Sequence, residues 1–468
     1  MISEDSQLKK YKDYFLTGIG GAGMSAIAIV LKGMGFNVSG SDLKESRYTN
    51  LLKREEIKVS IGHEAKNLKN AEAVIYSTAI SPSNVELIEA KKRGLPVFTR
   101  GEVLSWILNS KKGIAITGTH GKTTSTSMIS LIFRGLELDP TIIIGGELNE
   151  LGSNARFGNG DYIVAEACES DGTFLKYKPF ISVITNIEED HMDFWKDFEL
   201  LKKSFQKFIS NTKAGGFIVI DGDEIDLDFV RESALQPVFT YGINSSNDIY
   251  AADITFSNFG SSFCLVIKNN KNNEIKKYAV RLNVPGMHNI KNSLAALTVV
   301  SGLGLDIVKA LNILQYFTGA KRRFEKRGVK YGAVIFDDYA HHPTEIKATL
   351  DAALLEKKER IISVFQPHRY SRLMNMHHRF NNCFNNADIL VITDVFGSGE
   401  QPIPGVTGKL LVDSLIEDGF AGQLAYIPKL QDIKDYLNRN IKKDDIVLIM
   451  GAGDITRVTE DLLKSQEI

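Results

Sequence analysis

One segment of the chain has the residue types of a polyphosphate-binding loop. Glycines let backbone N–H groups approach phosphate oxygens, a lysine offsets their charge, and a threonine hydroxyl suits Mg²⁺. The common P-loop spacing would place a glycine at position 116, where this chain has Ile116, so the loop is a shortened form. We predict an ATP site here; the alternative is a glycine turn with a solvated lysine. The loop residues are Gly118, Thr119, His120, Gly121, Lys122, Thr123 and Thr124.

A second glycine-rich turn, built from Gly18, Gly20, Gly21 and Gly23, matches the dinucleotide fingerprint, and Asp42 follows Gly23 by nineteen residues. The pattern specifies only a diphosphate at a helix N-terminus and an acid near a ribose. A sugar nucleotide such as UDP carries both features, and so does NAD. Three interpretations therefore stay open: a UDP site, an NAD-dependent dehydrogenase, and a tight turn without a ligand.

Polar side chains that could hold a metal ion follow two further strand-like runs. Glu166 ends one run, and His191 comes shortly after another. Because the carboxyl ends of parallel strands share an edge with the phosphate loop, we expect both side chains to complete Mg²⁺ sites on the phosphates. We interpret the acids that surround His191 as a solvated turn. These acids are Glu188, Glu189, Asp190 and Asp193.

A cluster of imidazole and guanidinium groups lies in the last third of the sequence. Asp338, Tyr339 and His341 follow the apolar run 333–336, and Arg369 and Arg372 follow the run 361–365. A guanidinium can hold a carboxylate in two places, which suits the binding of a small amino acid. The alternative for both arginines is a surface ion pair. No group of histidines has zinc-ligand spacing, and we expect His63, His377 and His378 to be surface or packing residues.

Composition narrows the classes of function. The 468 residues carry 56 basic and 57 acidic side chains, a balance that provides no general field for nucleic acid or an anionic membrane. Three scattered cysteines favour reduced thiols, the first residues lack the apolar core of a signal peptide, and no apolar run approaches the ~18 residues of a membrane span. We expect a cytoplasmic enzyme, without nucleic acid or membrane partners, that is a monomer or a weak homo-oligomer.

Strands alternating with helices predict an α/β fold with mainly parallel sheets. We place domains at residues 1–110, 111–319 and 320–468, with Lys111 and Lys112 in a linker. Two helices should turn apolar stripes to the core: 197–210, and one with Ile346, Leu350, Ala353 and Leu354 on a single face. Alternation from 249 to 282, with a turn at 268–273, predicts an antiparallel excursion. The expected strands are 15–17, 37–39, 73–78, 96–99, 114–117, 142–144, 162–164, 181–184, 333–336, 361–365, 389–393 and 446–450.

Together these segments resemble the Mur ligases, the ATP-dependent enzymes that build the peptide of peptidoglycan. The loop 117–124, the segment 286–292 (GMHNIKN) and the segment 319–325 (GAKRRFE) match the family's phosphate loop, adenine-side motif and junction into the last domain. The resemblance runs from about residue 14 to residue 456. Further segments point to the alanine-adding member: 18–25 (GIGGAGMS), 337–345 (DDYAHHPTE), 366–372 (QPHRYSR), 399–406 (GEQPIPGV) and 451–455 (GAGDI).

The resemblance implies a Rossmann-like UDP-binding domain, a central P-loop ATPase-like domain and a C-terminal Rossmann-like domain that brings the amino acid. It implies ligation of L-alanine to UDP-N-acetylmuramate through an acyl phosphate, with ATP and Mg²⁺. The closest alternative is a murein tripeptide recycling ligase.

The resemblance also assigns roles residue by residue. Lys122 contacts phosphates, while Thr123, Glu166 and His191 hold metal; the catalytic set adds His341, Arg369 and Arg372. Cys168 stands where the family more often has Asp and receives no role, and Lys203 is only a candidate for the carbamylated lysine of some members. The ATP side adds His288, Asn289, Asn292, Arg323 and Asp338; the UDP side has Gly18, Gly20, Gly21, Gly23, Met24, Ser25 and Asp42; the amino-acid side has Tyr339, His341, Arg369 and Arg372.

Overall fold

The computed structural model describes residues 8–148, 151–257, 259–269 and 274–464. These residues form three sheets and group into two compact units. Unit 1 comprises the described residues of 1–254, 263–282 and 290–318, and contains the first sheet and most of the second. Unit 2 comprises the described residues of 255–262, 283–289 and 319–468, and contains the third. The boundaries predicted at residues 110 and 319 remain predictions.

The first sheet is parallel throughout, with strand order β3-β2-β1-β4-β5. The runs expected to form strands do so. The edge strand β3 was not predicted, because its short, partly exposed sequence KVSI lacks an apolar run. The elements are β1 (Asp13–Thr17), α2 (Ala22–Gly33), β2 (Asn37–Asp42), α3 (Arg47–Arg54), β3 (Lys58–Ile61), η1 (Ala65–Leu68), β4 (Ala73–Tyr76), α4 (Val85–Lys92), β5 (Val97–Thr99) and α5 (Arg100–Asn109).

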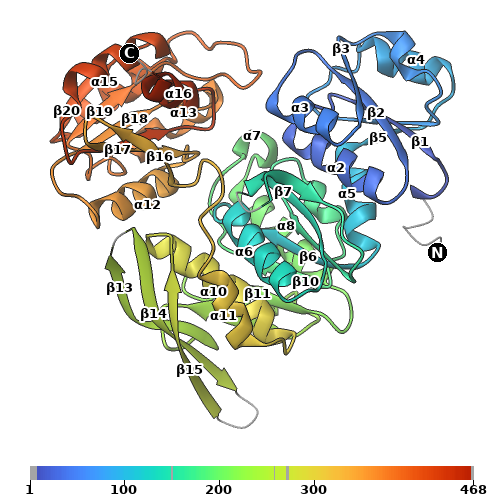
Figure 1. Cartoon of the computed structure of the whole chain (residues 1–468), viewed down its shortest axis with the longest axis horizontal. Coiled ribbons are helices and arrows are strands. Elements are labelled where there is room, and N and C mark those ends of the chain that lie inside the picture. Colours follow the sequence, from blue (N-terminus) through green and yellow to red (C-terminus); the bar gives the residue numbers. More distant parts are fainter. Residues whose placement is uncertain (1–7, 149–150, 258, 270–273, 465–468) are drawn as a thin grey trace. The chain divides into compact units, whose positions relative to one another are not determined.

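The second sheet has the order β15-β14-β13-β12-β11-β10-β6-β9-β7-β8, and its last three strands β13 to β15 extend as a long ribbon (Figure 1). β7 and β8 pair antiparallel. All the other neighbours from β13 across to β7, in the order β13-β12-β11-β10-β6-β9-β7, pair in parallel. The predicted linker was wrong for Lys112, which already begins β6, whereas Lys111 lies between α5 and β6 and donates to the carbonyls of Gly158 and Gly160. The tip of the expected turn at 268–273 lies outside the described residues from position 270 on.

The helices of this sheet include the predicted stripe, and Leu201, Phe205, Phe208 and Ile209 are buried. The elements are β6 (Lys112–Thr117), α6 (Lys122–Gly135), β7 (Thr141–Leu148), β8 (Ser153–Arg156), β9 (Tyr162–Glu166), η2 (Thr173–Lys176), β10 (Ile181–Ile184), α7 (Met192–Trp195), α8 (Phe198–Ser210), β11 (Phe217–Asp221), α9 (Leu227–Arg231), β12 (Val238–Gly242), β13 (Ile249–Ser257), β14 (Gly260–Asn269), β15 (Glu274–Leu282), α10 (Met287–Gly302) and α11 (Ile307–Leu314).

The third sheet has the order β16-β17-β21-β18-β19-β20 and is parallel except for β16. Neighbours along β17 pack into different core clusters, Ile335 into one and Phe336 into the other, so the sheet is buried on both faces. Leu354 is 45% exposed, so its predicted core position was wrong; it is the last residue of α12. The elements are β16 (Glu325–Lys330), β17 (Ala333–Asp338), α12 (Pro343–Leu354), β18 (Ile361–Phe365), α13 (Tyr370–Met376), η3 (His377–Phe380), β19 (Ile389–Ile392), α14 (Gly408–Glu417), β20 (Gln423–Tyr426), α15 (Leu430–Asn440), β21 (Ile446–Met450) and α16 (Thr456–Lys464).

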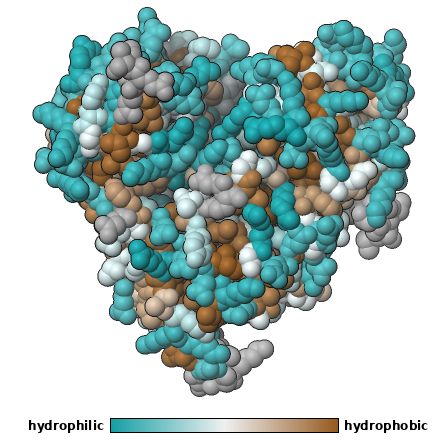
Figure 2. Space-filling model, viewed as in Figure 1, coloured by the Kyte–Doolittle hydropathy of each residue, from teal (hydrophilic) through white to brown (hydrophobic). Residues whose placement is uncertain are grey.

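Two observations concern the hydropathy of the molecule: the surface that Figure 2 shows and the length of the apolar helices. On the face that Figure 2 shows, hydrophilic residues predominate and apolar residues appear in separate groups. Among the described residues, no helix is both long and apolar enough to cross a bilayer.

Candidate active site

The predicted phosphate loop connects β6 to α6 and has the backbone that its glycines permit. Gly118 (φ 126°) and Gly121 (φ 81°) both lie in the left-handed region, and a Cβ on Gly118 would stand 2.2 Å from Thr185 Oγ1. Gly121 is the N-cap of α6, so Lys122 opens the helix at the positive end of its dipole. The loop therefore offers backbone N–H groups and a lysine to an anion at one point.

The carboxyl end of β10 braces this loop. The backbone N–H of His120 donates to Asn186 Oδ1 at 2.9 Å, and Thr185 Oγ1 donates to the carbonyls of Thr117 and His120. Glu188 N donates to Thr119 Oγ1 at 2.8 Å. These contacts hold the loop in its shape through its neighbouring strand.

Lys122 is paired with an acid that the sequence interpretation missed. Its Nζ lies 3.1 and 3.2 Å from the carboxylate oxygens of Glu169, and it also donates to the carbonyls of Gly118 and Thr119. Burial, the largest single influence, would by itself lower the pKa of Lys122. Its interactions with Glu169, Cys168 and Glu166 together outweigh burial, and the pKa stands above its usual value. Lys122 is therefore a fixed, charged cation of the loop.

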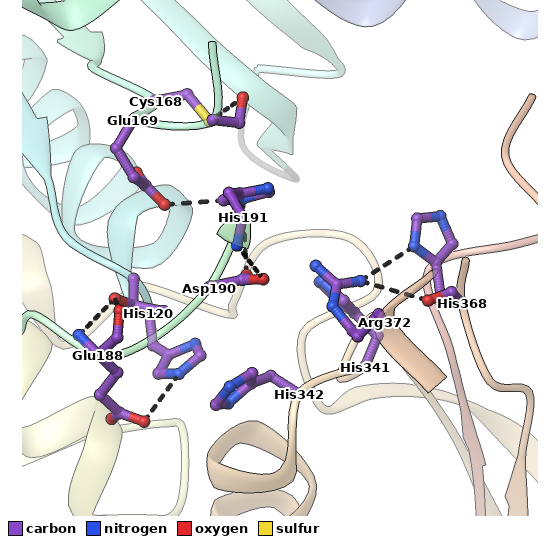
Figure 3. A network of polar contacts seen from close by, with 12 residues as sticks. His120, Cys168, Glu169, Glu188, Asp190, His191, His341, His342, His368 and Arg372 are labelled. Atoms are coloured by element: carbon purple, nitrogen blue, oxygen red, sulfur yellow. Dashed lines mark hydrogen bonds and ion pairs between the residues drawn. The ribbon is translucent and has the colours of Figure 1, made fainter. Parts of the chain in front are cut away.

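The three residues predicted to hold metal lie around the same loop. Thr123 is buried in the first turn of α6, Glu166 ends β9 and accepts from Gly145 N at 2.8 Å, and His191 caps α7 in a left-handed conformation (φ 56°). His191 Nε2 lies 3.7 Å from Glu169 Oε1 and 3.5 Å from Asp190 Oδ2 (Figure 3). Carboxylate and hydroxyl oxygens are donors that Mg²⁺ prefers, so Thr123 and Glu166 fit the ion, whereas the imidazole of His191 is a softer donor.

The acidic turn around His191 is only partly solvated, so its interpretation as a solvated turn was wrong for Asp190. Asp190 is buried and accepts from His191 N at 2.7 Å, and Glu188 Oε2 lies 3.6 Å from His120 Nε2. The side chain of Asp193 lies outside the described part of the chain. The sequence offered one signal for the contact of Asp190, which directly precedes His191.

The resemblance assigned no role to Cys168 and named Lys203 only as a candidate; the structure shows the surroundings of both. Burial raises the pKa of the Cys168 thiol, which donates to Ser170 Oγ at 3.1 Å. Lys203 is exposed on α8.

The adenine-side residues are placed on α10 and at its start. Asn292 Oδ1 accepts from Ser125 Oγ at 3.1 Å, and a Cβ on Gly121 would stand 2.5 Å from that oxygen, so Asn292 packs on the phosphate loop. Within unit 2, Asn289 donates to the carbonyl of Pro285 at 2.7 Å. Burial, together with Arg323, lowers the pKa of His288 to about 4, so its imidazole is neutral at pH 7.

The second glycine turn links β1 to α2. Gly20 N donates to Asp42 Oδ2 at 2.8 Å, and a Cβ on Gly20 would stand 2.8 Å from both that oxygen and Thr49 Cγ2. Gly18 has a φ of 78°, and Gly21 is the N-cap of α2. The turn and the acid predicted for the UDP site are thus in direct contact at the carboxyl end of the sheet.

Met24 and Ser25, also predicted for the UDP side, are buried in the first turn of α2. Ser25 Oγ donates to the carbonyl of Ala22, and Asn154 on β8 donates to both of these oxygens at 3.1 and 2.6 Å. Both side chains are buried in the fold, and their assignment to the UDP side stays a prediction. The backbone N–H of Ser25 donates to the carbonyl of Gly21 at 2.9 Å.

In unit 2 a second group of predicted residues follows β17. Asp338 accepts from Phe324 N and Ala340 N, both at 2.6 Å, and burial raises its pKa to about 6 although Arg323 acts to lower it. The guanidinium carbons of Arg322 and Arg323 lie 5.1 and 5.2 Å from the centre of the Tyr339 ring. The aromatic ring and two cations thus form one group beside the buried acid.

A row of imidazoles leads from Tyr339 to Arg372. His341 Nδ1 lies 3.0 Å from the Tyr339 carbonyl and 3.3 Å from Glu345 Oε2, and its ring centre lies 5.5 Å from that of His368. Arg372 is 8% exposed, and its Nη1 lies 3.2 Å from His368 Nδ1 (Figure 3). Arg372 is therefore a buried guanidinium and not a surface ion pair.

Arg369 occupies a constrained backbone position at the N-cap of α13. Its φ is 70°, and its N–H donates to the carbonyl of Phe396 at 2.9 Å. The same segment stacks His368 on Phe396 at an interplanar angle of 14°. The structure brings Tyr339, His341 and Arg372 together through His368, which the sequence-based set of site residues omitted.

Comparison with known families covers nearly the whole chain. The model of the Mur ligase family catalytic domain matches residues 14–112, that of the Mur ligase middle domain matches residues 116–300, and that of the Mur ligase glutamate ligase domain matches residues 322–453.

Curated relatives match at full length. A UDP-N-acetylmuramate–L-alanine ligase of Desulforamulus reducens is 43% identical over 98% of this chain and 99% of its own, and that of Rubrobacter xylanophilus is 44% identical over 96% and 98%. The crystal structure of a UDP-N-acetylmuramate–alanine ligase from Thermotoga maritima has a TM-score of 0.81 at 27% identity, covering 97% of this chain and 98% of that chain. A murein peptide ligase from Psychrobacter arcticus (TM-score 0.72, 24% identity, 97% and 98% coverage) shares the fold. The three-domain α/β prediction is confirmed.

Proposed function

The chain belongs to the Mur ligase family, and we propose that it joins L-alanine to UDP-N-acetylmuramate at the expense of ATP. Full-length relatives at 43% and 44% identity carry that name. The observation that carries the proposal is the charged Lys122 at the N-terminus of α6, which pairs with a buried acid. Such a cation suits a phosphoryl group in transfer.

In the first step, a carboxylate oxygen of the lactyl group attacks the γ-phosphorus of ATP. The bond to the β,γ-bridging oxygen breaks, and ADP leaves with its electron pair. An acyl phosphate is formed. Lys122 and the N–H groups of the loop offset the charge that both anionic reactants bring together. Residues Thr123, Glu166 and His191 would hold Mg²⁺, which when bound supplies charge neutralisation on the phosphates.

In the second step, the neutral amine of alanine attacks the acyl carbon, phosphate leaves, and the amine loses a proton. Arg372, buried beside His368, is suited to hold the carboxylate of alanine, and we assign the amino-acid side to Tyr339, His341, Arg369 and Arg372. Asp338, Arg323, His288, Asn289 and Asn292 are assigned to ATP. Because the acyl phosphate is lost if water reaches it, exclusion of solvent is part of the proposal.

The alternatives lack comparable support. A murein tripeptide recycling ligase is not favoured, because the curated relatives that match at full length are named for alanine addition, and the TM-score of a murein peptide ligase (0.72) is below that of the alanine ligase (0.81). A dehydrogenase leaves the Lys122 loop without a role. We place the reaction in the cytoplasm, where ATP is supplied. We also propose that the domains meet at residues 110 and 319. The protein is proposed to be a monomer or a weak homo-oligomer.

The decisive experiment measures phosphate release from ATP, with UDP-N-acetylmuramate fixed and each amino acid added in turn. Alanine should give the highest kcat/KM. Release that depends on a tripeptide in place of alanine would favour the recycling ligase. Nicotinamide fluorescence on addition of NADH tests the dehydrogenase, and binding there would contradict the UDP assignment of the turn at residues 18–23.

A further inference from the structure

Arg100 lies against the glycine turn of the sugar-nucleotide site. A Cβ built on Gly23 would stand 3.0 Å from its Nη1 and 3.2 Å from its Cδ, so the arginine side chain runs over the first turn of α2. Arg100 is itself the first residue of α5, which packs on α2 (Figure 1). The guanidinium thus belongs to the N-terminal turn of α5 and lies beside the N-terminal turn of α2. A cation is disfavoured in both places, because the positive ends of the helix dipoles repel it.

A carboxylate from the neighbouring segment offsets this charge. Asp171 Oδ2 lies 3.1 Å from Arg100 Nη2, and each side chain is 23% exposed. Asp171 is fixed in turn, since its Oδ1 accepts from Thr173 N at 3.0 Å and a Cβ on Gly101 would stand 2.4 Å from Thr173 Oγ1. One carboxylate therefore pairs with the guanidinium at the N-terminus of α5, and the pair is still reachable from solvent.

We propose that Arg100 is a diphosphate-binding residue of the sugar-nucleotide site and that Asp171 is the positioning residue that holds it. The inference rests on the proposed function and adds the cation that the glycine turn by itself lacks. A diphosphate carries more negative charge than one carboxylate, and the planar guanidinium can donate to its oxygens while Asp171 keeps the side chain in place. The competing explanation is a structural ion pair that fastens α5 to the segment 171–173.

Calorimetric titration of the full chain with UDP separates the two explanations. We expect Arg100→Ala to raise the Kd for UDP at least roughly tenfold, which is about 1.4 kcal/mol, and to leave the Kd for ATP unchanged. Arg100→Lys keeps the charge without the fork and should lose about threefold. Asp171→Asn keeps a hydrogen-bond acceptor for Arg100 and should change the Kd for UDP by less than about threefold. The control is Arg156→Ala, which breaks an ion pair with Asp139 of 2.6 Å in the same unit and should change neither Kd.

Two results would overturn the inference. An unchanged Kd for UDP in Arg100→Ala would remove Arg100 from the site. Equal losses of UDP affinity in Arg100→Ala and Asp171→Asn, with ATP binding also weakened, would mean that the two residues form a structural ion pair. If Arg100→Ala does not fold, an unchanged Kd for UDP in Arg100→Lys decides against the inference. The proposed function fails separately, if the unsubstituted chain does not bind UDP at all.

Discussion

Lys122 Nζ and Glu169 Oε2 lie 3.1 Å apart, and the two side chains are 14% and 2% exposed. The lysine that should meet the phosphates of ATP is thus held by a buried carboxylate. A buried cation needs such a partner, because desolvation without one is costly. The pair therefore determines both the charge of the lysine and its position at the start of α6.

Replacing Lys122 by alanine should remove nearly all turnover and leave the fold intact. The lysine meets charge that builds up during phosphoryl transfer, and one such contact in a dry site is worth on the order of 3 kcal/mol or more. We expect kcat for phosphate release to fall at least roughly a hundredfold. Near-normal kcat in a correctly folded Lys122→Ala protein would contradict the loop assignment.

Replacing Glu169 by glutamine should destabilise the free protein more than the protein saturated with ATP. Lys122 would keep its charge in a buried place without a counter-ion, at a cost of about 3 kcal/mol, until the phosphates supply one. The increase in Tm on adding ATP should therefore be larger in Glu169→Gln than in the unsubstituted chain. Glu199→Gln, from an exposed pair with Lys202, is the matched control. Equal increases in all three proteins would show that Glu169 does not compensate Lys122.

Replacing Gly20 by valine should raise the KM for UDP-N-acetylmuramate far more than the KM for ATP. A side chain at this position would meet Asp42 Oδ2 and Thr49 Cγ2 at 2.8 Å, so the turn must move away from the acid that positions it. Steady-state kinetics with each substrate varied would measure both constants. A larger rise in the KM for ATP would mean that the two phosphate sites are assigned the wrong way round.

Replacing Arg372 by lysine should raise the KM for alanine at least roughly tenfold, or about 1.4 kcal/mol, because lysine cannot hold a carboxylate in two places. ATP affinity measured without alanine should hardly change. Arg379→Lys, at an exposed position of η3, is the control. An unchanged KM for alanine in both Arg372→Lys and Arg369→Lys would remove this cluster from the amino-acid site.

The affinity for ATP should fall as the pH falls through about 6, where Asp338 takes up a proton. Its carboxylate form is the better acceptor for a ribose hydroxyl, so the KM for ATP should rise in acid and lose this pH dependence in Asp338→Asn. Stability changes in the other direction: the pKa of Asp338 in the folded chain lies above its usual 3.8, so the folded state binds the proton more tightly. The contribution of Asp338 to stability therefore declines as the pH rises from about 4 to 6. Acid does not unfold the protein through this residue, so unfolding cannot explain a rise in the KM for ATP at low pH. A pH-independent KM between 5 and 8 would contradict the role of Asp338.

Much of the architecture could be predicted because it depends on local pattern. Apolar runs such as 114–117 and 446–450 form strands of buried parallel sheets, and the left-handed backbone of Gly118 and Gly121 is available mainly to glycine. Strands that lack an apolar run could not be found this way: β3 (KVSI) is half exposed at a sheet edge, and its pairing with β2 makes it a strand.

The sequence by itself determined the two glycine loops, the order of the sheets along the chain and the family to which the chain belongs, because spacing and side-chain type are enough for each. Only the tertiary structure decided which acid holds Lys122. Glu166 and Glu169 stand three residues apart in one segment, and Glu169 is the one that reaches the lysine, while Glu166 accepts from Gly145. In the same way, folding placed Arg100 beside Gly23 and buried Ser25 against Asn154. Such partners come from strands and helices far apart in the chain, so their distances follow from packing and not from local spacing.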